Sequence, residues 1–558
     1  MGSRPRIGEP TTGVGAVLDQ TFPRQRVRAE LFDDYRRRGL WGTRTFNDVL
    51  AEATVDRWPD NLFVVASPTH PASLTFREMH ERGLRLAGAL HALGLRKGDV
   101  LAMEMPNWME ACLLYHAATA LGVVVTPIIH IYQAKEVEFI LRQSRAKAFV
   151  VPDDWRGVDY LAMVDRIRPN LPDLQHVIIA GQKIPEGSMS FADLEAMETP
   201  DFPRPDITPD EPHILAYTSG TTADPKGVVH SHNTLLSVSR LMAEGGQLKD
   251  DVVMLCPNPI GHIAGIFSAL ISPFFLGYPK LVLMDGWDPK WALELIQEHR
   301  VTVTGGATFF AMTMLNVPEF ASYDLSSLQQ FGLGGAGVPP SIVQQLQAQG
   351  WSSSRSYGCT EHPAITMGYL GDPPAKGALT DGRPHPATEL KLVDDDGRDV
   401  PNGEEGEVLS RGPSQFLGYM DPAMDAEAFD ADGWFRTGDI GRLDADGYLT
   451  ITDRKKDIII RGGENISARE VEEILATHPK VQESAVTSVA DERYGERVCA
   501  FVITRENQPL SLEEILTHFK ENGVAKQKTP ERLELVTEFP RTLSGKIQKY
   551  VLRRRLEG

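Results

Sequence analysis

Short apolar segments alternate with longer segments of helical spacing along most of this 558-residue chain. Thr75–Leu95 has helical spacing, Val100–Met105 is a short apolar run, and Trp108–Ala120 again has helical spacing. Further strand candidates are Phe149–Val151, Val177–Ala180, Leu281–Asp285, Val301–Thr304 and Phe331–Gly334. Such alternation favours helices layered on sheets, so the sequence predicts an α/β fold.

The chain is several times longer than an average domain, so we expect more than one structural unit. The Pro-rich segment Thr199–Pro212 is typical of a linker. From Leu390 to Asp453 the pattern changes to short segments separated by glycine turns, which are typical of β-hairpins. These turns are Asp395–Gly397, Ala431–Gly433 and Ala445–Gly447.

The last hundred or so residues have a pattern of their own. Helix, strand, strand and helix candidates follow one another, and a basic tail ends the chain. The candidates are Ala468–Thr477, Val481–Val489, Arg497–Ile503 and Leu512–Asn522. We therefore predict a large N-terminal domain over residues 1–453, with a β-rich subdomain, and a small α+β C-terminal domain over residues 454–558.

Composition excludes several classes of protein. The net charge of -19 and the pI near 5.3 argue against a nucleic-acid partner, because no basic surplus exists to neutralise a phosphate backbone. The four cysteines lie far apart without metal-ligand or redox spacing, which favours a reduced, cytoplasmic protein. Histidines and a proline interrupt the apolar stretches 111–131 and 261–277, so we expect buried core there and no integral membrane segment.

A loop rich in hydroxyls and glycine lies in the segment Tyr217–His232. Its hydroxyl and backbone N–H donors, its flexible glycine and its lysine suit a phosphate group. These candidates are Thr218, Ser219, Gly220, Thr221, Thr222 and Lys226. A Ser/Thr/Gly stretch by itself is more often a solvated linker, so the choice depends on the other motifs.

Further motifs follow in a fixed order: Gly332–Pro340, Tyr357–Glu361, Gly433–Asp439, Tyr448–Asp457 and Pro540–Lys546. In this order they resemble the acyl-adenylate-forming superfamily, whose members include acyl-CoA synthetases, peptide-synthetase adenylation domains and firefly-type luciferases. The resemblance covers nearly the whole chain. It implies a mobile C-terminal domain. It also implies that a carboxylate attacks the α-phosphorus of ATP, giving acyl-AMP and pyrophosphate, and that a thiol then captures the acyl group.

The resemblance also implies roles for individual residues at the nucleotide. Glu361 and Thr221 would hold Mg²⁺, and the loop described above would hold the triphosphate. Tyr357 would stack on adenine, and Asp439 would accept hydrogen bonds from the ribose hydroxyls. The other nucleotide contacts would come from Gly335, Ala336, Gly337, Thr360 and Arg454. Taken singly, Glu361 is as well explained as a helix cap, Asp439 as a turn residue and Tyr357 as core.

Catalysis would depend on Lys546, His262, Thr221 and Glu361. In the family, the lysine that matches Lys546 neutralises the charge that builds in the adenylation transition state. The ordinary alternative is a solvated lysine in a basic tail.

The resemblance further implies a rotation of the small domain. Lys456 matches the pivot, where many members have Asp, and Gly462 and Gly463 would line the passage for the CoA arm. An ordinary glycine turn is the alternative. The phosphate loop also departs from the family, with Ala223 where Gly is usual; this stiffens the loop without removing a chemical group.

The acyl pocket would involve His262, Ala264, Gly334 and Gly358. No Asp is present near His262 to bind an α-ammonium group, and no Asn follows it to meet a 2-hydroxyaryl group. An apolar acid of medium-chain, alicyclic or simple aromatic type is therefore favoured, which places the protein in fatty-acid or related lipid metabolism.

Free CoA is the favoured acceptor because no carrier domain follows Lys546. A freestanding ligase that loads a carrier protein is the alternative, and a catalytically silent nucleotide-binding regulator is an alternative of another class. Because Pro540–Lys546 resembles a motif that is switched off by lysine acetylation, an acetyltransferase and a deacetylase are candidate partners. A homodimer is left open.

Overall fold

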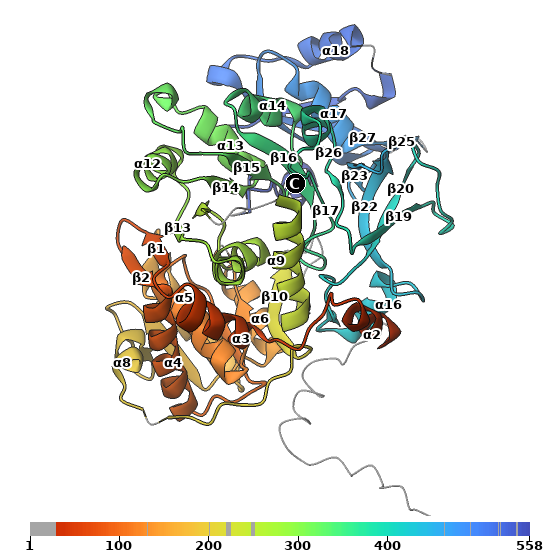
Figure 1. The fold of residues 1–558 in the computed structure, drawn as a ribbon. Coiled ribbons are helices and arrows are strands. Elements are labelled where there is room, and N and C mark those ends of the chain that lie inside the picture. The colour runs from red at the N-terminus through yellow and green to blue at the C-terminus, as the bar shows by residue number, and fades with distance from the viewer. Residues whose placement is uncertain are drawn as a thin grey trace, which may run out of the picture. The chain divides into compact units, whose positions relative to one another are not determined.

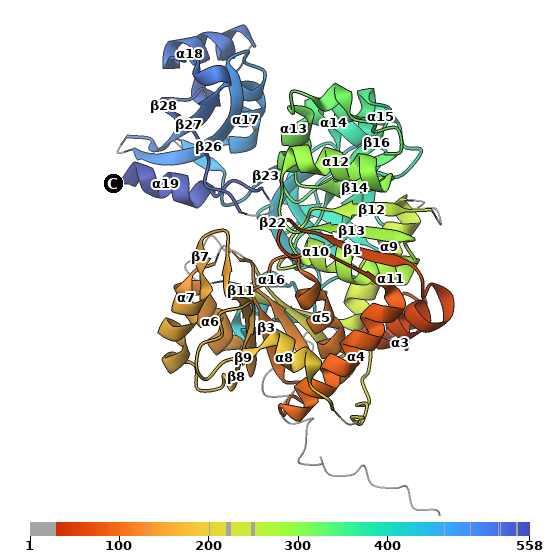
Figure 2. The ribbon, with the colours of Figure 1, turned by 90° about the vertical axis from the view of Figure 1, so that its left-hand side faces the viewer.

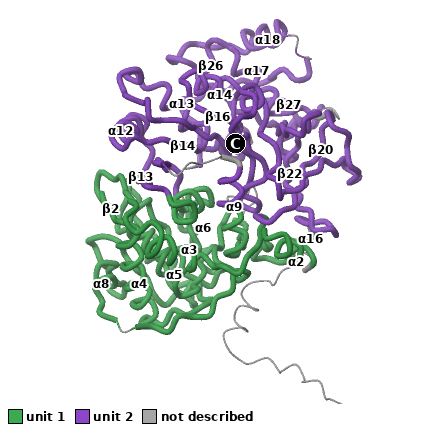
Figure 3. The backbone as a smooth tube through the Cα atoms, viewed as in Figure 1, with its two compact units in different colours: residues 1–237, 260–277, 415–426 green, residues 238–259, 278–414, 427–558 purple. Residues whose placement is uncertain are grey.

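The structure is a computed structural model that forms two compact units, shown in different colours in Figure 3. Unit 1 comprises residues 1–237, 260–277 and 415–426, and unit 2 comprises residues 238–259, 278–414 and 427–558. The predicted boundary at residues 453 and 454 lies inside unit 2 and stays a prediction. The structure describes residues 29–130, 132–199, 201–218, 225–246, 251–461, 464–491, 493–522, 524, 526–542 and 545–557.

Unit 1 is built on a mixed sheet in the order β21, β11, β10, β4, β3, β5, β8, β9. In that order the strands span Gly418–Tyr419, Lys226–Ser231, Pro212–Thr218, Val124–Pro127, Val100–Met103, Ala148–Pro152, His176–Ala180 and Met189–Ser190. Every residue of β3, β4 and β5 is buried, as expected for parallel strands covered on both faces.

The helices of unit 1 include α2 (Ala29–Arg37), α3 (Phe46–Ala51), α4 (Phe76–Ala92), α5 (Met109–Leu121), α6 (Ala134–Ser144), α7 (Tyr160–Ile167) and α8 (Phe191–Ala196). Helix α4 begins where the sequence predicts, because Thr75 and Glu78 form a reciprocal capping box. Helices α4 and α5 lie side by side in both Figure 1 and Figure 2. A Cβ added to Gly83 of α4 would lie 2.8 Å from the Cβ of His116 in α5, so this glycine permits the close packing.

Both apolar stretches considered for a membrane are largely buried in unit 1. The first forms α5 and β4, and the second forms the short helices α10 (Ile263–Gly265) and α11 (Ser272–Leu276) with a π-helical turn between them. Among the residues that the structure describes, no helix has both the length and the apolar character needed to cross a bilayer.

Unit 2 contains a parallel set of strands in the order β16, β15, β14, β12, β13, and β17 and β18 extend it in antiparallel orientation from β16. Their bounds are Ser352–Tyr357, Gln330–Leu333, Val303–Gly306, Val253–Cys256, Lys280–Met284, Thr366–Met367 and Arg383–Pro384. Helices α12 (Pro289–His299), α13 (Thr308–Leu315), α14 (Pro340–Ala348) and α15 (Pro374–Leu379) connect these strands. The α/β class predicted from the sequence is thus confirmed.

An antiparallel sheet of β19 (Glu389–Val393), β20 (Glu405–Arg411), β22 (Phe435–Leu443) and β23 (Leu449–Arg454) follows. The predicted glycine turns share one chemistry. In each, an aspartate carboxylate accepts backbone N–H bonds from the residues two and four positions on, and the glycine has a φ near +80°. These aspartates are Asp394, Asp430 and Asp444. The second turn closes an isolated bridge between Phe429 and Phe435 after the short helix α16 (Asp425–Ala428).

The C-terminal part of unit 2 has the sheet order β25, β24, β27, β26, with β28 paired to β27. Its strands are Glu464–Ile466, Ile459–Arg461, Gly495–Thr504, Val481–Asp491 and Arg532–Leu535, and its helices are α17 (Ala468–Ala476), α18 (Leu512–Glu521) and α19 (Lys549–Glu557). The predicted helices and the two long strands are confirmed. The basic tail is not a solvated extension, because it forms α19 and buries Leu552.

Candidate active site

The carboxylate of Asp439 is the centre of the site in unit 2. Asp439 on β22 and Arg454 on β23 are cross-strand partners, and the Nε of Arg454 donates to Oδ1 of Asp439 at 2.6 Å. The hydroxyl of Tyr357, at the end of β16, donates to Oδ2 at 2.7 Å. Asp439 is only 4% exposed, so these two donors replace much of the water that a carboxylate needs.

The same contacts fix the protonation of both donors. Asp439 raises the pKa of Arg454 above its usual value, so the guanidinium stays charged. Burial, followed by the charge of Asp439, raises the pKa of Tyr357 well above its usual value, so the hydroxyl keeps its proton and continues to donate. A carboxylate held in this way can accept further hydrogen bonds from the two hydroxyls of a ribose.

The glycine loop after β15 has two kinds of glycine. Gly335 has a φ of +76°, and a Cβ added at Gly335 or Gly337 would meet no described residue within 4 Å, so with respect to this part of the chain the backbone is open to a flat ligand. In contrast, a Cβ at Gly334 would lie 2.5 Å from Oγ of Ser356. Ala336 between the two open glycines is half-buried.

The segment after Tyr357 turns back on itself. A Cβ at Gly358 would lie 2.3 Å from the carbonyl oxygen of Pro363, so the fold itself requires this glycine. The backbones of Cys359 and His362 exchange hydrogen bonds at 3.1 and 3.2 Å. Thr360 and Glu361 are half-buried on this turn. Gly334 and Gly358, predicted to line the acyl pocket, therefore each have a reason in protein packing, and their contact with an acyl group stays a prediction.

Glu361 is suited to the metal role that the sequence predicts. The charge of Glu361 contributes to the raised pKa of the Cys359 thiol, after burial, so the carboxylate lies near this thiol. Within the described residues no group of three or more His, Cys, Asp or Glu side chains could hold a metal ion alone. A single carboxylate fits Mg²⁺ nevertheless, because Mg²⁺ in ATP enzymes takes one or two carboxylates together with phosphate oxygens and water.

Lys546 belongs to the same unit and lies in the electrostatic field of this site. The Arg454 guanidinium lowers the pKa of Lys546 to about 8, with burial second and Asp439 opposing the shift. The Lys546 side chain is exposed to solvent, so the charge of Arg454 is the main cause of this lowered pKa. The charge of Lys546 therefore interacts with the charges of Arg454 and Asp439.

The predicted pivot, Lys456, is exposed at the turn that follows β23. Here the backbone N–H groups of Asp457 and Ile458 both donate to the carbonyl of Arg454, at 2.8 and 3.1 Å. Lys456 also contributes to the lowered pKa of Lys546. Gly462 and Gly463, predicted to line the CoA passage, lie outside the described residues; the flanking strands β24 and β25 pair with each other.

Unit 1 contains the remaining predicted residues. Thr218 at the end of β10 and Lys226 at the start of β11 are cross-strand partners, so they frame the predicted phosphate loop. Lys226 Nζ lies 5.5 Å from the ring centroid of Tyr419. Ser219, Gly220, Thr221, Thr222 and Ala223 lie outside the described residues.

His262 caps the short helix α10, and its Nδ1 accepts from the backbone N–H of Ala264 at 3.2 Å. The preceding Gly261 allows this loop to lie against the segment that follows β4, because a Cβ there would be 2.8 Å from the carbonyl oxygen of Ile128. His262 and Ala264 are half-buried. The cap of α10 is enough to explain why these two residues lie at a helix start. Their contact with a substrate stays a prediction.

Sequence reasoning missed two residues that shape the site. Thr437 accepts from the backbone N–H of Asp439 at 3.1 Å and donates to the carbonyl of Val408 at 2.8 Å, which fixes the strand beneath the carboxylate. Arg541 donates to the carbonyl of Gly545 at 3.0 Å next to Lys546. Both lie inside motifs quoted above, Gly433–Asp439 and Pro540–Lys546. Their place in these motifs was the one feature of the sequence that could have indicated a role at the site.

Comparison with known proteins agrees with this arrangement. Residues 51–420 match the family model described as AMP-binding enzyme, and residues 470–546 match that of the AMP-binding enzyme C-terminal domain. The chain is 37% identical to the medium-chain fatty-acid–CoA ligase of Escherichia coli (strain K12), covering 96% of this chain and 93% of that protein. It is 31% identical to the 2,3-dihydroxybenzoate-AMP ligase of Bacillus subtilis (strain 168), covering 94% and 96%.

A solved structure of an anthranilate CoA ligase in complex with anthranoyl-AMP superposes with a TM-score of 0.84 at 28% identity, covering 92% of this chain and 98% of that chain. The fold and the motifs therefore lead to one assignment. The chain belongs to the AMP-binding enzyme family, the acyl-adenylate-forming ligases that include the acyl-CoA synthetases.

Proposed function

We propose that this protein is an ATP- and Mg²⁺-dependent acyl-CoA synthetase acting on an apolar carboxylic acid of medium-chain, alicyclic or simple aromatic type. In the first half-reaction an oxygen of the acid attacks the α-phosphorus of ATP, and the bond to pyrophosphate breaks. In the second, the CoA thiol, losing its proton, attacks the acyl carbon, and AMP leaves. Both steps transfer a group without any change of oxidation state.

The observation that carries this proposal is the grouping of Asp439, Arg454 and Tyr357 in unit 2, with Lys546 interacting with the same charges. Asp439 would bind the ribose, and the open backbone at Gly335 and Gly337 would accept the adenine. Lys546 would neutralise the oxygens of the pentacovalent transition state, where charge is greatest. A Mg²⁺ bound by Glu361 and the phosphates would supply further neutralisation of charge.

The acid class rests on residues near the predicted acyl pocket. His262 is followed by Ile263, which is buried, and by Ala264, which is half-buried, so this part of the loop offers no charged partner for an ammonium or a second carboxylate. The medium-chain ligase from E. coli supports an aliphatic acid, and the anthranilate CoA ligase supports an aromatic one. We therefore propose the shared property, an apolar body carrying one carboxylate.

A carrier-protein ligase is the second candidate, because the 2,3-dihydroxybenzoate-AMP ligase matches over almost its whole length. The deciding experiment measures AMP release with ATP, Mg²⁺ and a panel of fatty, cyclic and aryl acids, with and without CoA. CoA-dependent turnover on one class of acid supports the synthetase. ATP–pyrophosphate exchange without CoA turnover supports the carrier-protein ligase, and no exchange with any acid supports the silent regulator.

A substitution in the predicted CoA passage separates the two half-reactions further. Gly463→Trp should leave ATP–pyrophosphate exchange within about 2-fold of wild type and lower CoA-dependent turnover by about 10-fold or more, because an indole would narrow the passage. A parallel loss of both activities would show that Gly463 does not line a passage used by the thiol alone.

The proposed setting is a reducing compartment such as the cytoplasm. Within the described residues, none of the four cysteines is in a disulfide, and Cys112, Cys256 and Cys499 are buried.

A further inference from the structure

The Lys546 loop, by which we mean the described residues Arg541, Thr542, Gly545 and Lys546, lies against Phe309, the second residue of α13. A Cβ added at Gly545 would lie 2.7 Å from the Cβ of Phe309 and 3.5 Å from that of Ala307. Gly545 also has a φ of +79°, which disfavours any side chain. The glycine next to Lys546 is therefore required both by its own backbone and by the close approach of α13.

Arg541 also holds this loop in place. Its Nη1 donates to the carbonyl of Gly545 at 3.0 Å, and its guanidinium lies 5.2 Å from the ring centroid of Phe309 and 5.7 Å from that of Phe539. Arg541 also forms an ion pair with Glu483 on β26. The guanidinium thus links the C-terminal sheet, the Lys546 loop and α13 through contacts of different kinds.

Within the loop, the backbone is tied independently of Phe309. The N–H of Thr542 donates to the carbonyl of Lys546 at 2.7 Å, and the N–H of Gly545 donates to the carbonyl of Thr542 at 2.8 Å. The N–H of Lys546 donates to Oγ1 of Thr542 at 3.1 Å. Thr542, Gly545 and Lys546 are therefore held to one another without Phe309, and what Phe309 adds is their position.

Phe309 contributes less to the core of unit 2 than its neighbour Phe310 does. Phe310 is 2% exposed and packs on Trp287 at 4.6 Å between ring centroids, whereas Phe309 is only half-buried. The first residue of the same helix, Thr308, donates from its hydroxyl to the carbonyl of Gly337 at 3.0 Å. Helix α13 therefore contacts both the open glycine loop and the Lys546 loop.

We propose that Phe309 and Arg541 are positioning residues that seat the Lys546 loop for adenylation and are not used in thioester formation. This inference rests on the proposed function. Phe309 gives the loop a fixed apolar platform, and Arg541 holds the loop to that platform. In the thioester step the thiol attacks the acyl carbon and no pentacovalent phosphorus forms, so the placement of Lys546 beside the attacked phosphorus gives no advantage there.

The test compares Phe309→Ala, Phe309→Leu and Arg541→Lys with Leu315→Ala, a control at a half-buried position of the same helix. Exchange of pyrophosphate into ATP reports adenylation, and thioester formation from synthetic acyl-AMP and CoA reports the second step. Phe309→Ala should lower kcat for exchange by about 10- to 100-fold, the usual effect of a displaced catalytic group. Thioester formation should stay within about 2-fold for every variant.

The variants are expected to differ in degree. Phe309→Leu keeps an apolar platform but loses the ring beneath Arg541, so its exchange rate should lie between those of wild type and Phe309→Ala. The pH profile of kcat/KM for ATP gives a second readout. Its basic limb, expected near pH 8 from Lys546, should move upward in Phe309→Ala because the ammonium moves away from Arg454.

Several results would overturn the proposal. Equal losses in both half-reactions would mean that Phe309 supports the fold in general, and unchanged exchange with an unchanged pH profile would mean that the contact is incidental. If Phe309→Ala does not fold, as judged by its Tm, Phe309→Leu and Arg541→Lys decide the matter by the same criteria. Failure of the proposed function is distinguishable, since wild-type protein would then lack exchange altogether.

Discussion

Three buried histidines of unit 1 and two buried charged side chains of unit 2 show two different ways of placing a titratable group in a protein interior. Unit 1 holds His116, His213 and His232 in its interior, where burial lowers their pKa values, to about 3 for His116 and His232 and well below the usual range for His213. Unit 2 buries the carboxylate of Asp439, which accepts hydrogen bonds from Arg454 and Tyr357. It also buries Arg355, which is 2% exposed and donates to the carbonyls of Thr380 and Val338.

The difference follows from what each interior offers a charge. The rings of His213 and His232 stack with 4.0 Å between their centroids, and the ring centroid of His116 lies 4.9 Å from that of Phe274. These imidazoles therefore pack as apolar rings do and stay neutral. In unit 2, Asp439 and Arg355 have donors or acceptors that replace water. These histidines of unit 1 thus avoid a buried charge, whereas Asp439 of unit 2 keeps its charge where a nucleotide is proposed to bind.

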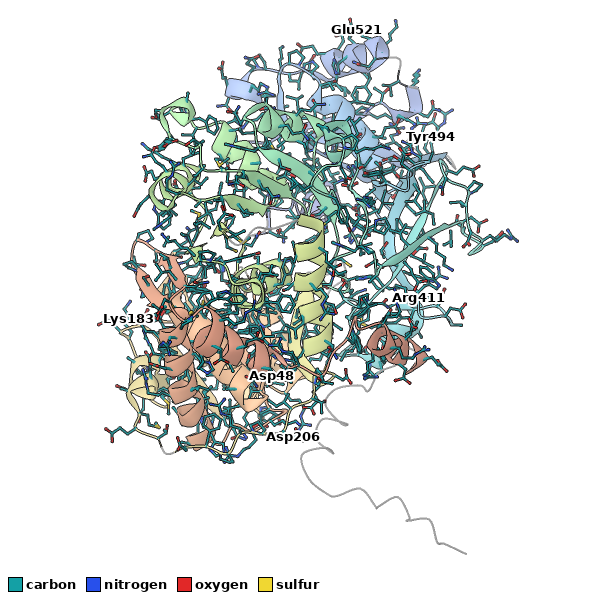
Figure 4. The ribbon with its side chains drawn as sticks, viewed as in Figure 1. Asp48, Lys183, Asp206, Arg411, Tyr494 and Glu521 are labelled. Atoms are coloured by element: carbon teal, nitrogen blue, oxygen red, sulfur yellow. The ribbon has the colours of Figure 1, made fainter. Side chains whose placement is uncertain are left out.

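If the charges of unit 2 carry the chemistry, removing the proposed catalytic cation should have the largest effect. Lys546→Ala should lower ATP–pyrophosphate exchange by about 10³-fold or more, in the range found for lost transition-state donors or above it. Thioester formation from supplied acyl-AMP should survive. Lys183→Ala is the control, because Lys183 is an exposed lysine of unit 1, labelled at its periphery in Figure 4. Retention of exchange in Lys546→Ala would remove this residue from the mechanism.

Acidification should destabilise unit 1 through its neutral histidines. Their folded pKa values lie below the unfolded value of 6.5, so between the two values the unfolded chain binds protons that the folded chain does not. The stabilisation is present above the unfolded pKa and is lost as pH falls toward the folded pKa. Each histidine should cost up to about 1.4 kcal/mol per pH unit in this window.

Denaturant unfolding between about pH 7 and pH 5, with a probe placed in unit 1, measures this loss. His80 in unit 1, with a pKa lowered to about 4 by burial, adds to it. An unfolding free energy that does not change over this range would show that these histidines are not buried neutral groups in solution.

Local chemistry made some elements predictable from sequence. The Thr75 and Glu78 capping box marks the start of α4, and the three aspartate-glycine turns mark breaks in the β-rich region. Each depends on residues a few positions apart, which a reader of the sequence can see together. The Asp439 and Arg454 pair could be suspected as well, because the turn at Gly447 brings their strands into one hairpin.

Contacts between distant segments could not be predicted in the same way. Lys549 looks like part of a solvated basic tail, yet it lies 2.8 Å from Glu472 of α17. Similarly, nothing beside Arg355 shows that it will be buried, since its carbonyl partners belong to other segments. Phe309 and Gly545 are separated by most of unit 2, so their contact depends on tertiary packing that local patterns do not encode.

A smaller effect should follow from neutralising the centre of the nucleotide site. Asp439→Asn keeps the size of the side chain but leaves Arg454 without its 2.6 Å carboxylate partner and offers the ribose a weaker acceptor. We expect KM for ATP to rise by about 10- to 100-fold, equivalent to about 1.4 to 2.7 kcal/mol. Asp446→Asn is the matched control on an exposed turn, where the carboxylate pairs with Lys376. Equal effects of the two substitutions would argue that Asp439 does not bind the nucleotide.

The smallest effect should come from unit 1, at His116. Among the residues that the structure describes, neither ring nitrogen of His116 has a hydrogen-bond partner, so the folded protein gains little from its polarity. His116→Leu keeps an apolar side chain against Phe274 and should change the unfolding free energy at neutral pH by less than about 1.5 kcal/mol. Its pH dependence should be shallower than that of wild type, because one group no longer takes up a proton on unfolding. A large loss of stability at neutral pH, with an unchanged pH slope, would mean that His116 makes a polar contact in solution, and the contrast between the neutral interior of unit 1 and the paired charges of unit 2 would then fail at this residue.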